Sequence, residues 1–208
     1  MSIAYKISEY NRNRKWRRFL KIFKPSPELK VLDVGFSEQE YSKTDNFLEK
    51  HYPYQDKITA LGIDRANEFN KRYPNIKTVT YTGETFPFHN KEFDVCWSNA
   101  VIEHVGDEMK QLKFLQEINR VSRHGYLTTP NKMFPIEVHT RLPLLHYLPK
   151  RWFDEIIRHT NRKWAADEYM HLLTERKLRR LLSTAGIDKY KIYKNRIAFF
   201  TLDFVVIF

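Results

Sequence analysis

The chain has 208 residues, of which 42% are hydrophobic and 15% aromatic, so it can bury the core of one domain and is not composed like a disordered chain. Its single cysteine, Cys96, excludes an internal disulfide and a multi-cysteine zinc site. The formal net charge of +11 favours contact with nucleic acid, an anionic membrane surface or acidic small molecules, and it says nothing about the fold.

Segment 1–28 is predicted to be a basic, amphipathic helical segment. Among its many lysines and arginines, Trp16, Phe19, Leu20 and Phe23 recur at the helical spacing i, i+3, i+4, i+7. This spacing favours a helix that packs its apolar stripe against the domain and turns its basic face to water. The alternative is a contact face for nucleic acid or for anionic membrane headgroups, although no nucleic-acid-binding signature accompanies it.

The sequence carries no signal for secretion or membrane insertion. The N-terminus lacks the apolar region of a signal peptide, and no run reaches the roughly 18 apolar residues that a membrane-spanning helix needs. The apolar stretch 199–208 is interrupted by Asp203 and is interpreted as a buried final strand. Because a reducing compartment fits the single cysteine, we expect a cytoplasmic protein.

Strand-like and helical patterns alternate over the first two thirds of the chain. Strands are predicted over 29–35, 57–64, 76–82, 92–99 and 124–130, and helices over 43–52, 65–73 and 106–122. In the last of these helices, Met109, Leu112, Leu115, Ile118 and Val121 follow the helical period. The alternation predicts an α/β protein with a mostly parallel sheet and helices on both faces.

Segment 131–165 interrupts this alternation. It is rich in proline, histidine and aromatic residues and is too long for an ordinary loop, so we expect an insertion with short helices that acts as a lid over the carboxyl edge of the sheet. Residues 174–187 then predict a helix, with Thr174 as its N-cap and Gly186 as its stop signal. Two closing strands follow, which we expect to form a hairpin.

Acidic residues mark the ends of the first two predicted strands, at the edge where open α/β sheets bind ligands. Strand one ends in Asp33 and Gly35, and strand two ends in Asp64. An acidic side chain at the end of strand two would accept hydrogen bonds from both hydroxyls of a ribose. Taken singly, each residue has a simpler explanation: an ordinary turn for Asp33 and a helix N-cap for Asp64.

The order of four motifs, LDVG, GID, TGETFPFHNKEFDVCWSNAVIEHV and GYLTTPN, resembles that of class I S-adenosylmethionine-dependent methyltransferases, nearest to the small type 11-like group. The resemblance covers about residues 10–190. It implies a single methyltransferase domain over 1–208 with a Rossmann-like, doubly wound, seven-stranded sheet whose last strand is antiparallel. It also implies an enzyme of class EC 2.1.1 that uses S-adenosyl-L-methionine and releases S-adenosylhomocysteine.

The same resemblance implies a cofactor site at the strand ends. Asp33 would orient the amino end of the cofactor, Asp64 would hold its ribose, and the loop around Gly83 would lie near its adenine. The implied cofactor-binding set is Asp33, Gly35, Phe36, Ser37, Asp64, Arg65, Thr82, Gly83, Glu84 and Asn99.

The first turn departs from the family pattern, because Ser37 and Gln39 stand where further glycines are usual. We expect an altered but working turn, since the cofactor has no pyrophosphate for the backbone to approach closely. A domain that has lost cofactor binding is the alternative.

Methyl transfer from a sulfonium is a direct displacement, so the protein mainly has to align the reactants and exclude water. A base is needed only if the acceptor must lose a proton. The candidate catalytic residues are Glu103, His104 and His139, with Glu137 beside them, and His139 has the most suitable ordinary pKa. No HExxH pattern, acidic cluster or phosphate-binding glycine loop is present, so we expect no catalytic metal.

Segment 131–165 is expected to select the acceptor. Its leucines and aromatic residues would either line an apolar pocket or pack the segment onto the core. Its basic residues Lys150, Arg151, Arg158 and His159 would attract a phosphate or carboxylate. We therefore favour a small-molecule, sugar-containing or lipid-linked acceptor over nucleic acid, because the motif typical of base-methylating enzymes is absent after strand four.

Two other functions stay open. One is a non-catalytic, methyltransferase-like module that binds a partner through the basic helix. The other is an RNA methyltransferase, whose RNA affinity would fall steeply with salt. A dehydrogenase is disfavoured because the glycine-rich dinucleotide turn is missing. The oligomeric state is not predicted.

Overall fold

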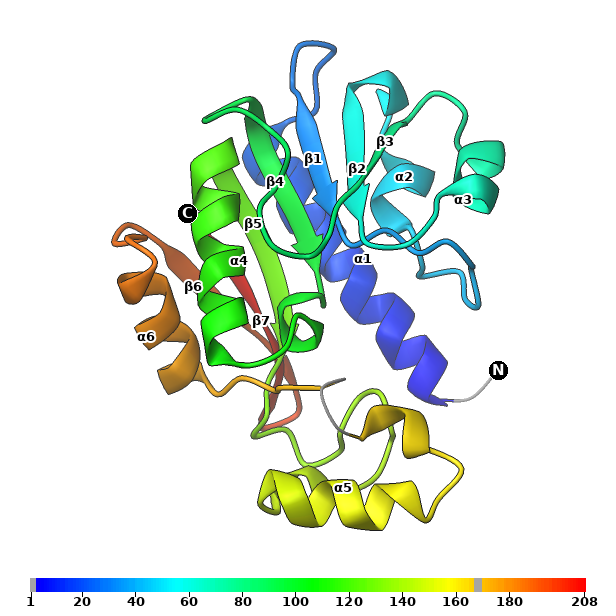
Figure 1. Cartoon of the computed structure of the whole chain (residues 1–208), viewed down its shortest axis with the longest axis vertical. Coiled ribbons are helices and arrows are strands. Elements are labelled where there is room, and N and C mark those ends of the chain that lie inside the picture. Colours follow the sequence, from blue (N-terminus) through cyan, green and yellow to red (C-terminus); the bar gives the residue numbers. More distant parts are fainter. Residues whose placement is uncertain (1–2, 167–169) are drawn as a thin grey trace. The chain divides into compact units, whose positions relative to one another are not determined.

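The computed structural model describes residues 3–166 and 170–208 (Figure 1). Residues 1–2 of the predicted basic segment lie outside the described residues. The chain divides into two compact units. Unit 1 comprises Met1–Asn99 and Ile118–Tyr126, and unit 2 comprises Ala100–Glu117 and Leu127–Phe208. The single-domain organisation over 1–208 stays a prediction, and each unit is described by itself.

Seven strands form one sheet in the order β3-β2-β1-β4-β5-β7-β6. The strands are β1 Val31–Val34, β2 Ile58–Gly62, β3 Lys77–Thr80, β4 Phe93–Asn99, β5 Ser122–Pro130, β6 Lys191–Ile197 and β7 Phe200–Ile207. Strand β1 pairs in parallel with β2 and β4, and β2 pairs in parallel with β3 (Figure 1). The hairpin of β6 and β7 is antiparallel. This confirms the Rossmann-like class, and the strand order reverses beside β1.

The helices of the described residues follow the predicted pattern. They are α1 Ile3–Phe23, α2 Phe47–His51, α3 Asn67–Arg72, α4 Glu108–Val121, α5 Lys150–Arg158 and α6 Glu175–Thr184. Four short 3₁₀ helices join them: η1 Gln55–Lys57, η2 Ile102–His104, η3 Leu145–Tyr147 and η4 Lys163–Ala165. Over the parts of the chain that the structure describes, no helix is both long and apolar enough to cross a membrane.

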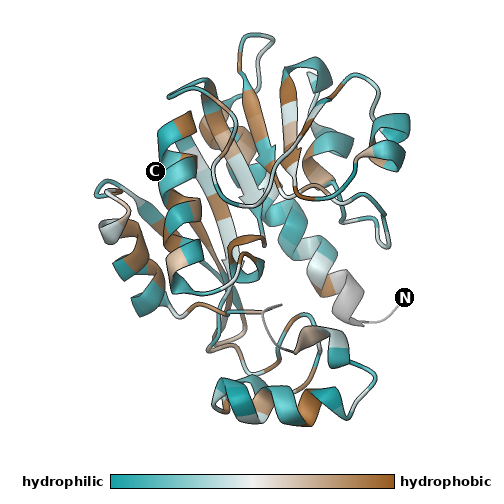
Figure 2. Cartoon of the chain, viewed as in Figure 1, coloured by the Kyte–Doolittle hydropathy of each residue, from teal (hydrophilic) through white to brown (hydrophobic). Residues whose placement is uncertain are grey.

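In unit 1, helix α1 contributes to the core, as its apolar stripe predicts. Trp16 and Phe19 are buried, and the Phe19 ring lies 5.0 Å from that of Trp97 on β4 and 5.4 Å from that of Tyr126 on β5. The Tyr126 hydroxyl donates a 2.7 Å hydrogen bond to the carbonyl of Lys15. Figure 2 shows the hydrophobic segments of β1 and β2 in brown, and all four residues of β1 are buried.

In helix α4, the prediction for Met109 is wrong, because this side chain is 77% exposed. The buried face of α4 includes Leu115, Ile118 and Val121 of the predicted stripe, and Met109 lies off that face. The other buried positions are Gln111, Phe114 and Glu117. The polar Gln111 lies on this face, where its side-chain nitrogen has two hydrogen-bond acceptors. The side chain of Gln111 donates to the carbonyls of Ile102 and His171 at 3.2 and 2.8 Å.

Segment 131–165 belongs to unit 2 and contributes to a small core of its own. Phe153, Ile157, Ala165, Ala166 and Met170 form a buried cluster, against which Leu142, Leu145 and Leu172 pack. These leucines therefore stabilise the segment, whereas Leu144 and Trp152 are each 56% exposed. The lid role of the segment stays a prediction.

In the last part of unit 2, helix α6 begins and ends where the sequence predicts. The Thr174 hydroxyl caps α6 by accepting the amide of Lys177 at 3.2 Å. Helix α6 ends at Thr184, just before Gly186. Asp203 lies buried in the apolar strand β7, where it accepts a 2.7 Å hydrogen bond from Asn195 on β6.

Candidate functional site

Strand β1 delivers Asp33 to the carboxyl edge of unit 1, where its carboxyl meets that of Glu49 on α2. Both side chains are buried, and a hydrogen bond joins them. Burial, and then the Glu49 carboxyl, raise the pKa of Asp33 well above its ordinary value. Burial also raises the pKa of Glu49. Like charges this close cannot both ionise readily, so loss of the second proton from the pair is disfavoured.

The loop after β1, residues 35–46, lacks the further glycines of the resembled family, and contacts of its own side chains hold it in place. Gly35 adopts φ 100°, a left-handed conformation that favours glycine, and its amide donates to the Leu61 carbonyl at 2.9 Å. The Asn46 amide clamps Ser37 from both sides: it accepts the Ser37 N–H at 2.8 Å and donates to the Ser37 carbonyl at 2.8 Å. Phe36 is buried against Phe69 of α3, with ring centres 4.5 Å apart.

One acidic side chain of the same loop, Glu38, caps the start of α3. The Glu38 carboxylate accepts the amides of Glu68 and Phe69 at 2.9 and 3.1 Å, which lowers its pKa. Because Glu38 fills this role, the helix has no need of an N-cap from Asp64, and Ala66 occupies the N-cap position. The N-cap explanation of Asp64 is therefore wrong.

The remaining predicted cofactor residues lie on the loops that follow β2 and β3 of unit 1 and at the end of β4. Asp64 and Arg65 are exposed, as are Thr82, Gly83 and Glu84. Gly83 adopts φ 91°, which again favours glycine. An added Cβ there would come within 3.9 Å of the Ile63 side chain, so the loops after β2 and β3 lie side by side. Asn99 ends β4 and is half-buried.

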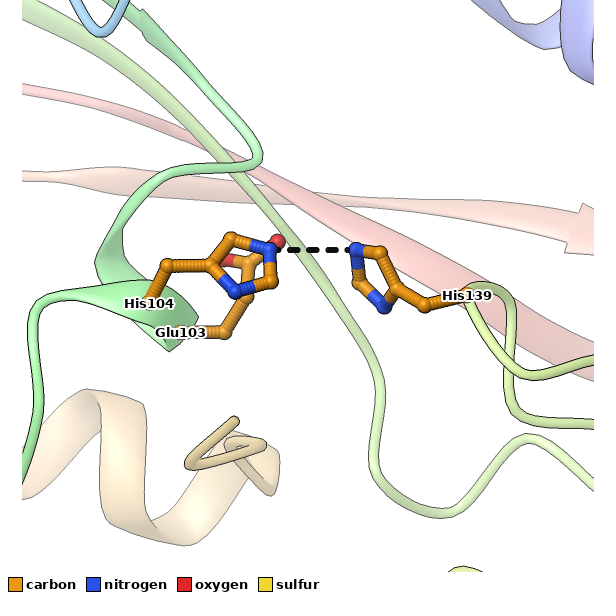
Figure 3. A group of neighbouring side chains, drawn as sticks. All are labelled: Glu103, His104 and His139. Atoms are coloured by element: carbon orange, nitrogen blue, oxygen red, sulfur yellow. Dashed lines mark hydrogen bonds between the residues drawn. The ribbon is translucent and has the colours of Figure 1, made fainter. Parts of the chain in front are cut away.

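Unit 2 brings the three predicted catalytic residues together (Figure 3). Glu103 and His104 lie on η2, and His139 comes from segment 131–165. The Nε2 atoms of His104 and His139 are 3.2 Å apart, with their rings nearly perpendicular at 83°. Glu103 is fully buried, and its Oε2 accepts a 2.9 Å hydrogen bond from the Thr129 hydroxyl. We call Glu103, His104 and His139 the Glu-His-His cluster.

Glu137 holds His139 in place. Its Oε1 lies 2.7 Å from Nδ1 of His139, and its carboxylate also accepts the amides of His139 and Thr140. Burial opposes the charge on Glu137, but these hydrogen bonds outweigh it and lower its pKa to about 2. Burial likewise opposes a charge on His139, yet the Glu137 carboxylate raises the pKa of the imidazole.

A cavity of about 270 Å³ opens in unit 2, and its lining is basic. Lys132, Lys150, Lys177, His146 and His171 line it together with apolar side chains such as Phe153 and Met170. We call it the lysine cavity. The amide of His171 donates a 2.7 Å hydrogen bond to the Glu103 carbonyl, so the backbone links one residue of the cavity lining to one residue of the Glu-His-His cluster.

Of these lysines, only Lys150 was predicted from the sequence to bind the acceptor. Lys150 lines the cavity and also binds Asp154 at 2.5 Å. Arg151, Arg158 and His159 lie exposed on or just after α5 and are not part of the lining, and the last two pair with Glu155. Lys132 and Lys177 were missed because they are far apart in the sequence and no local motif marks them.

Comparisons with known proteins find methyltransferases. Residues 33–128 match a type 11 family model described as "Methyltransferase domain". Over 104 residues the chain is 29% identical to a sarcosine/dimethylglycine N-methyltransferase from Aphanothece halophytica. That match covers 46% of this chain and spans only 35% of the length of the relative.

Solved structures share the fold. The PH0226 protein from Pyrococcus horikoshii superimposes with a TM-score of 0.63 at 14% identity, over 96% of this chain and 89% of that one. The N-terminal domain of EvdMO1, crystallised in the presence of S-adenosylhomocysteine and D-fucose, gives a TM-score of 0.57 at 18% identity, over 94% of this chain and 79% of that one. Residues 33–128 are thus similar to a methyltransferase domain, and the chain shares its fold with these solved structures.

Proposed function

We propose that the protein transfers the methyl group of S-adenosylmethionine to a small, anionic organic acceptor. The observation that carries the choice of acceptor is the lysine cavity of unit 2, in which Lys132, Lys150 and Lys177 converge beside apolar side chains. Such a lining suits a phosphate or carboxylate attached to an organic body. A sugar-containing acceptor is supported by the D-fucose present with the EvdMO1 domain.

The cofactor would lie at the carboxyl edge of unit 1. Asp33, within its buried carboxyl pair, is suited to the ammonium group of the cofactor, because the pair carries negative charge in a site that excludes water. Asp64 is exposed and not used as a helix cap, so its carboxylate is available to both ribose hydroxyls.

The reaction is a displacement at the methyl carbon. A lone pair of the acceptor forms the new bond while the carbon–sulfur bond breaks, and S-adenosylhomocysteine leaves as a neutral thioether. If the acceptor atom carries a proton, that proton must be removed. We assign the handling of this acceptor atom to the Glu-His-His cluster, whose neighbour His171 lines the lysine cavity.

Titration calorimetry with S-adenosylhomocysteine tests the cofactor half of the proposal. We expect saturable binding that Asp64→Ala weakens about tenfold or more, because hydrogen bonds to a charged group contribute about 1.5–3 kcal/mol. The exposed Asp188, changed to alanine, is the matched control and should bind like the wild type. A folded wild-type protein that binds no S-adenosylhomocysteine would refute the enzyme function and leave the partner-binding module.

The acceptor half is tested by measuring S-adenosylhomocysteine release with a panel of sugar phosphates, sugar acids and their uncharged parents. We expect turnover with an anionic member. Lys177→Met should then raise KM for it about tenfold, because one charge-assisted contact is lost. Lys189→Met, an exposed lysine outside the cavity, is the control. Equal turnover of charged and uncharged members would argue against an anionic acceptor.

A further inference from the structure

One buried oxygen atom of the Glu-His-His cluster lacks a hydrogen-bond partner, and methyl transfer alone does not account for this. Glu103 is 0% exposed, and its Oε1 has no hydrogen-bond partner among the described residues, although its Oε2 is bonded to Thr129. A buried carboxylate oxygen without a partner costs a large part of its hydration energy. This oxygen is therefore open to a further partner, and a cation is one group that would satisfy it.

The two imidazoles are spaced as ligands of one metal ion. In a tetrahedral zinc site the ion lies about 2.0–2.1 Å from each imidazole nitrogen, which places two such nitrogens about 3.3 Å apart. The Nε2 atoms of His104 and His139 are 3.2 Å apart. A carboxylate oxygen of Glu103 belongs to the same group, whose ligand atoms all lie within 4.8 Å of one another. Figure 3 shows the Glu103 carboxylate beside the His104 ring.

The surroundings of the cluster resemble those that orient metal ligands in proteins. The Glu137 carboxylate lies 2.7 Å from Nδ1 of His139, so that Nδ1 carries the proton and Nε2 keeps its lone pair toward His104. The Thr129 hydroxyl orients the Glu103 carboxylate by donating a hydrogen bond to its Oε2. Such partners set both the tautomer and the direction of a ligand before any ion arrives.

We propose that Glu103, His104 and His139 form a binding site for a divalent transition-metal ion, with Zn²⁺ the best match to two imidazoles and one carboxylate. Oxygen-seeking ions such as Mg²⁺ and Ca²⁺ fit this donor set poorly. Three protein ligands leave one position open, which is typical of catalytic zinc sites and not of structural ones. The absence of an HExxH motif does not bear on this site, because its ligands come from two separate segments.

The open position gives the site a role that rests on the proposed function. With an ion bound, the Nε2 lone pairs of both histidines are used, so neither imidazole can act as a base. An acceptor hydroxyl bound to the ion would then lose its proton more readily, because the ion would lower the pKa of that hydroxyl. A backbone hydrogen bond of His171 links the lining of the lysine cavity to the cluster, so an anionic acceptor held there would bring its oxygen atoms toward the ion.

The test uses tag-free, full-length protein, because a polyhistidine tag binds zinc. After dialysis against EDTA, Zn²⁺ binding is measured by calorimetry, and Co²⁺ is added as a spectroscopic substitute that absorbs visible light when tetrahedral. We expect one ion per chain. Changing His139 or His104 to alanine should weaken binding at least a hundredfold and abolish the Co²⁺ spectrum, and Glu137→Gln should weaken it about 10–100-fold.

Two controls keep the outcomes separate. His159→Ala removes a histidine that is 78% exposed and is not part of the Glu-His-His cluster. This variant should bind zinc like the wild type. S-adenosylhomocysteine binding, measured on the same samples, reports unit 1 and should survive in every histidine variant. Retained cofactor binding without zinc binding in the wild type would overturn the metal site alone, as would zinc affinity unchanged in both His104→Ala and His139→Ala. Loss of cofactor binding in the wild type would instead refute the proposed function.

Discussion

Replacing Phe19 with alanine is expected to lower the free energy of unfolding by about 3–5 kcal/mol, the largest stability effect of any single substitution considered for this chain. Phe19 is fully buried, and its ring contacts those of Trp16, Trp97 and Tyr126. Removing it leaves a cavity between α1 and two strands of unit 1, and it breaks several aromatic contacts at once. Urea denaturation followed by circular dichroism measures the loss.

The control is Ile22→Ala on the same helix, because Ile22 is 40% exposed and should cost little. A loss for Phe19→Ala no larger than the loss for Ile22→Ala would mean that α1 does not contribute to the core. That result would favour the alternative function, in which α1 binds a partner. The expected difference instead makes α1 a structural helix, on which Arg17 and Lys21 are exposed and Lys15 is buried.

Replacing Glu49 with glutamine is expected to stabilise the protein at alkaline pH and to leave its stability at pH 4 nearly unchanged. In the native state the pKa of Asp33 is raised by burial and by Glu49, so the folded chain keeps a proton that the unfolded chain loses. Stability therefore falls as the pH rises above the ordinary carboxyl pKa of about 4, by up to about 1.4 kcal/mol per pH unit for one proton. The fall continues until the pH passes the raised pKa.

In the glutamine variant one of the two charges is gone, and the new amide donates to Asp33, so this pH dependence should flatten. The measurement is the free energy of unfolding in urea at several pH values between 4 and 9. Glu28→Gln, an exposed carboxyl, is the control and should follow the wild type. If Glu49→Gln destabilises the protein at pH 8, the pair is not a source of repulsion.

The same pair connects stability with cofactor binding. Asp33→Asn should also relieve the repulsion, yet it removes the charge proposed to meet the cofactor ammonium. We therefore expect this variant to gain stability at alkaline pH and to lose affinity for S-adenosylhomocysteine. Functional sites commonly keep such destabilising charges because ligand binding compensates for them.

The amino-acid sequence by itself determined the fold class, and it predicts the place of the cofactor edge. Both depend on short-range patterns: the period of apolar residues separates strands from helices, and the residues that end β1, β2 and β3 can be read within each segment. The N-cap at Thr174 and the hairpin of β6 and β7 were predictable for the same reason. Met109 was misassigned because periodicity alone does not show which face of a helix is covered.

Only the tertiary structure decided how the sites are completed. The carboxyl pair of Asp33 and Glu49, the clamp of Asn46 on Ser37, and the spacing of His104 and His139 each join residues with no periodic relation in sequence. Lys132 and Lys177 likewise become neighbours only around the lysine cavity. Local propensity acts over a few residues, whereas burial, shared protons and ligand geometry depend on distances in space, which the path of the folded chain sets.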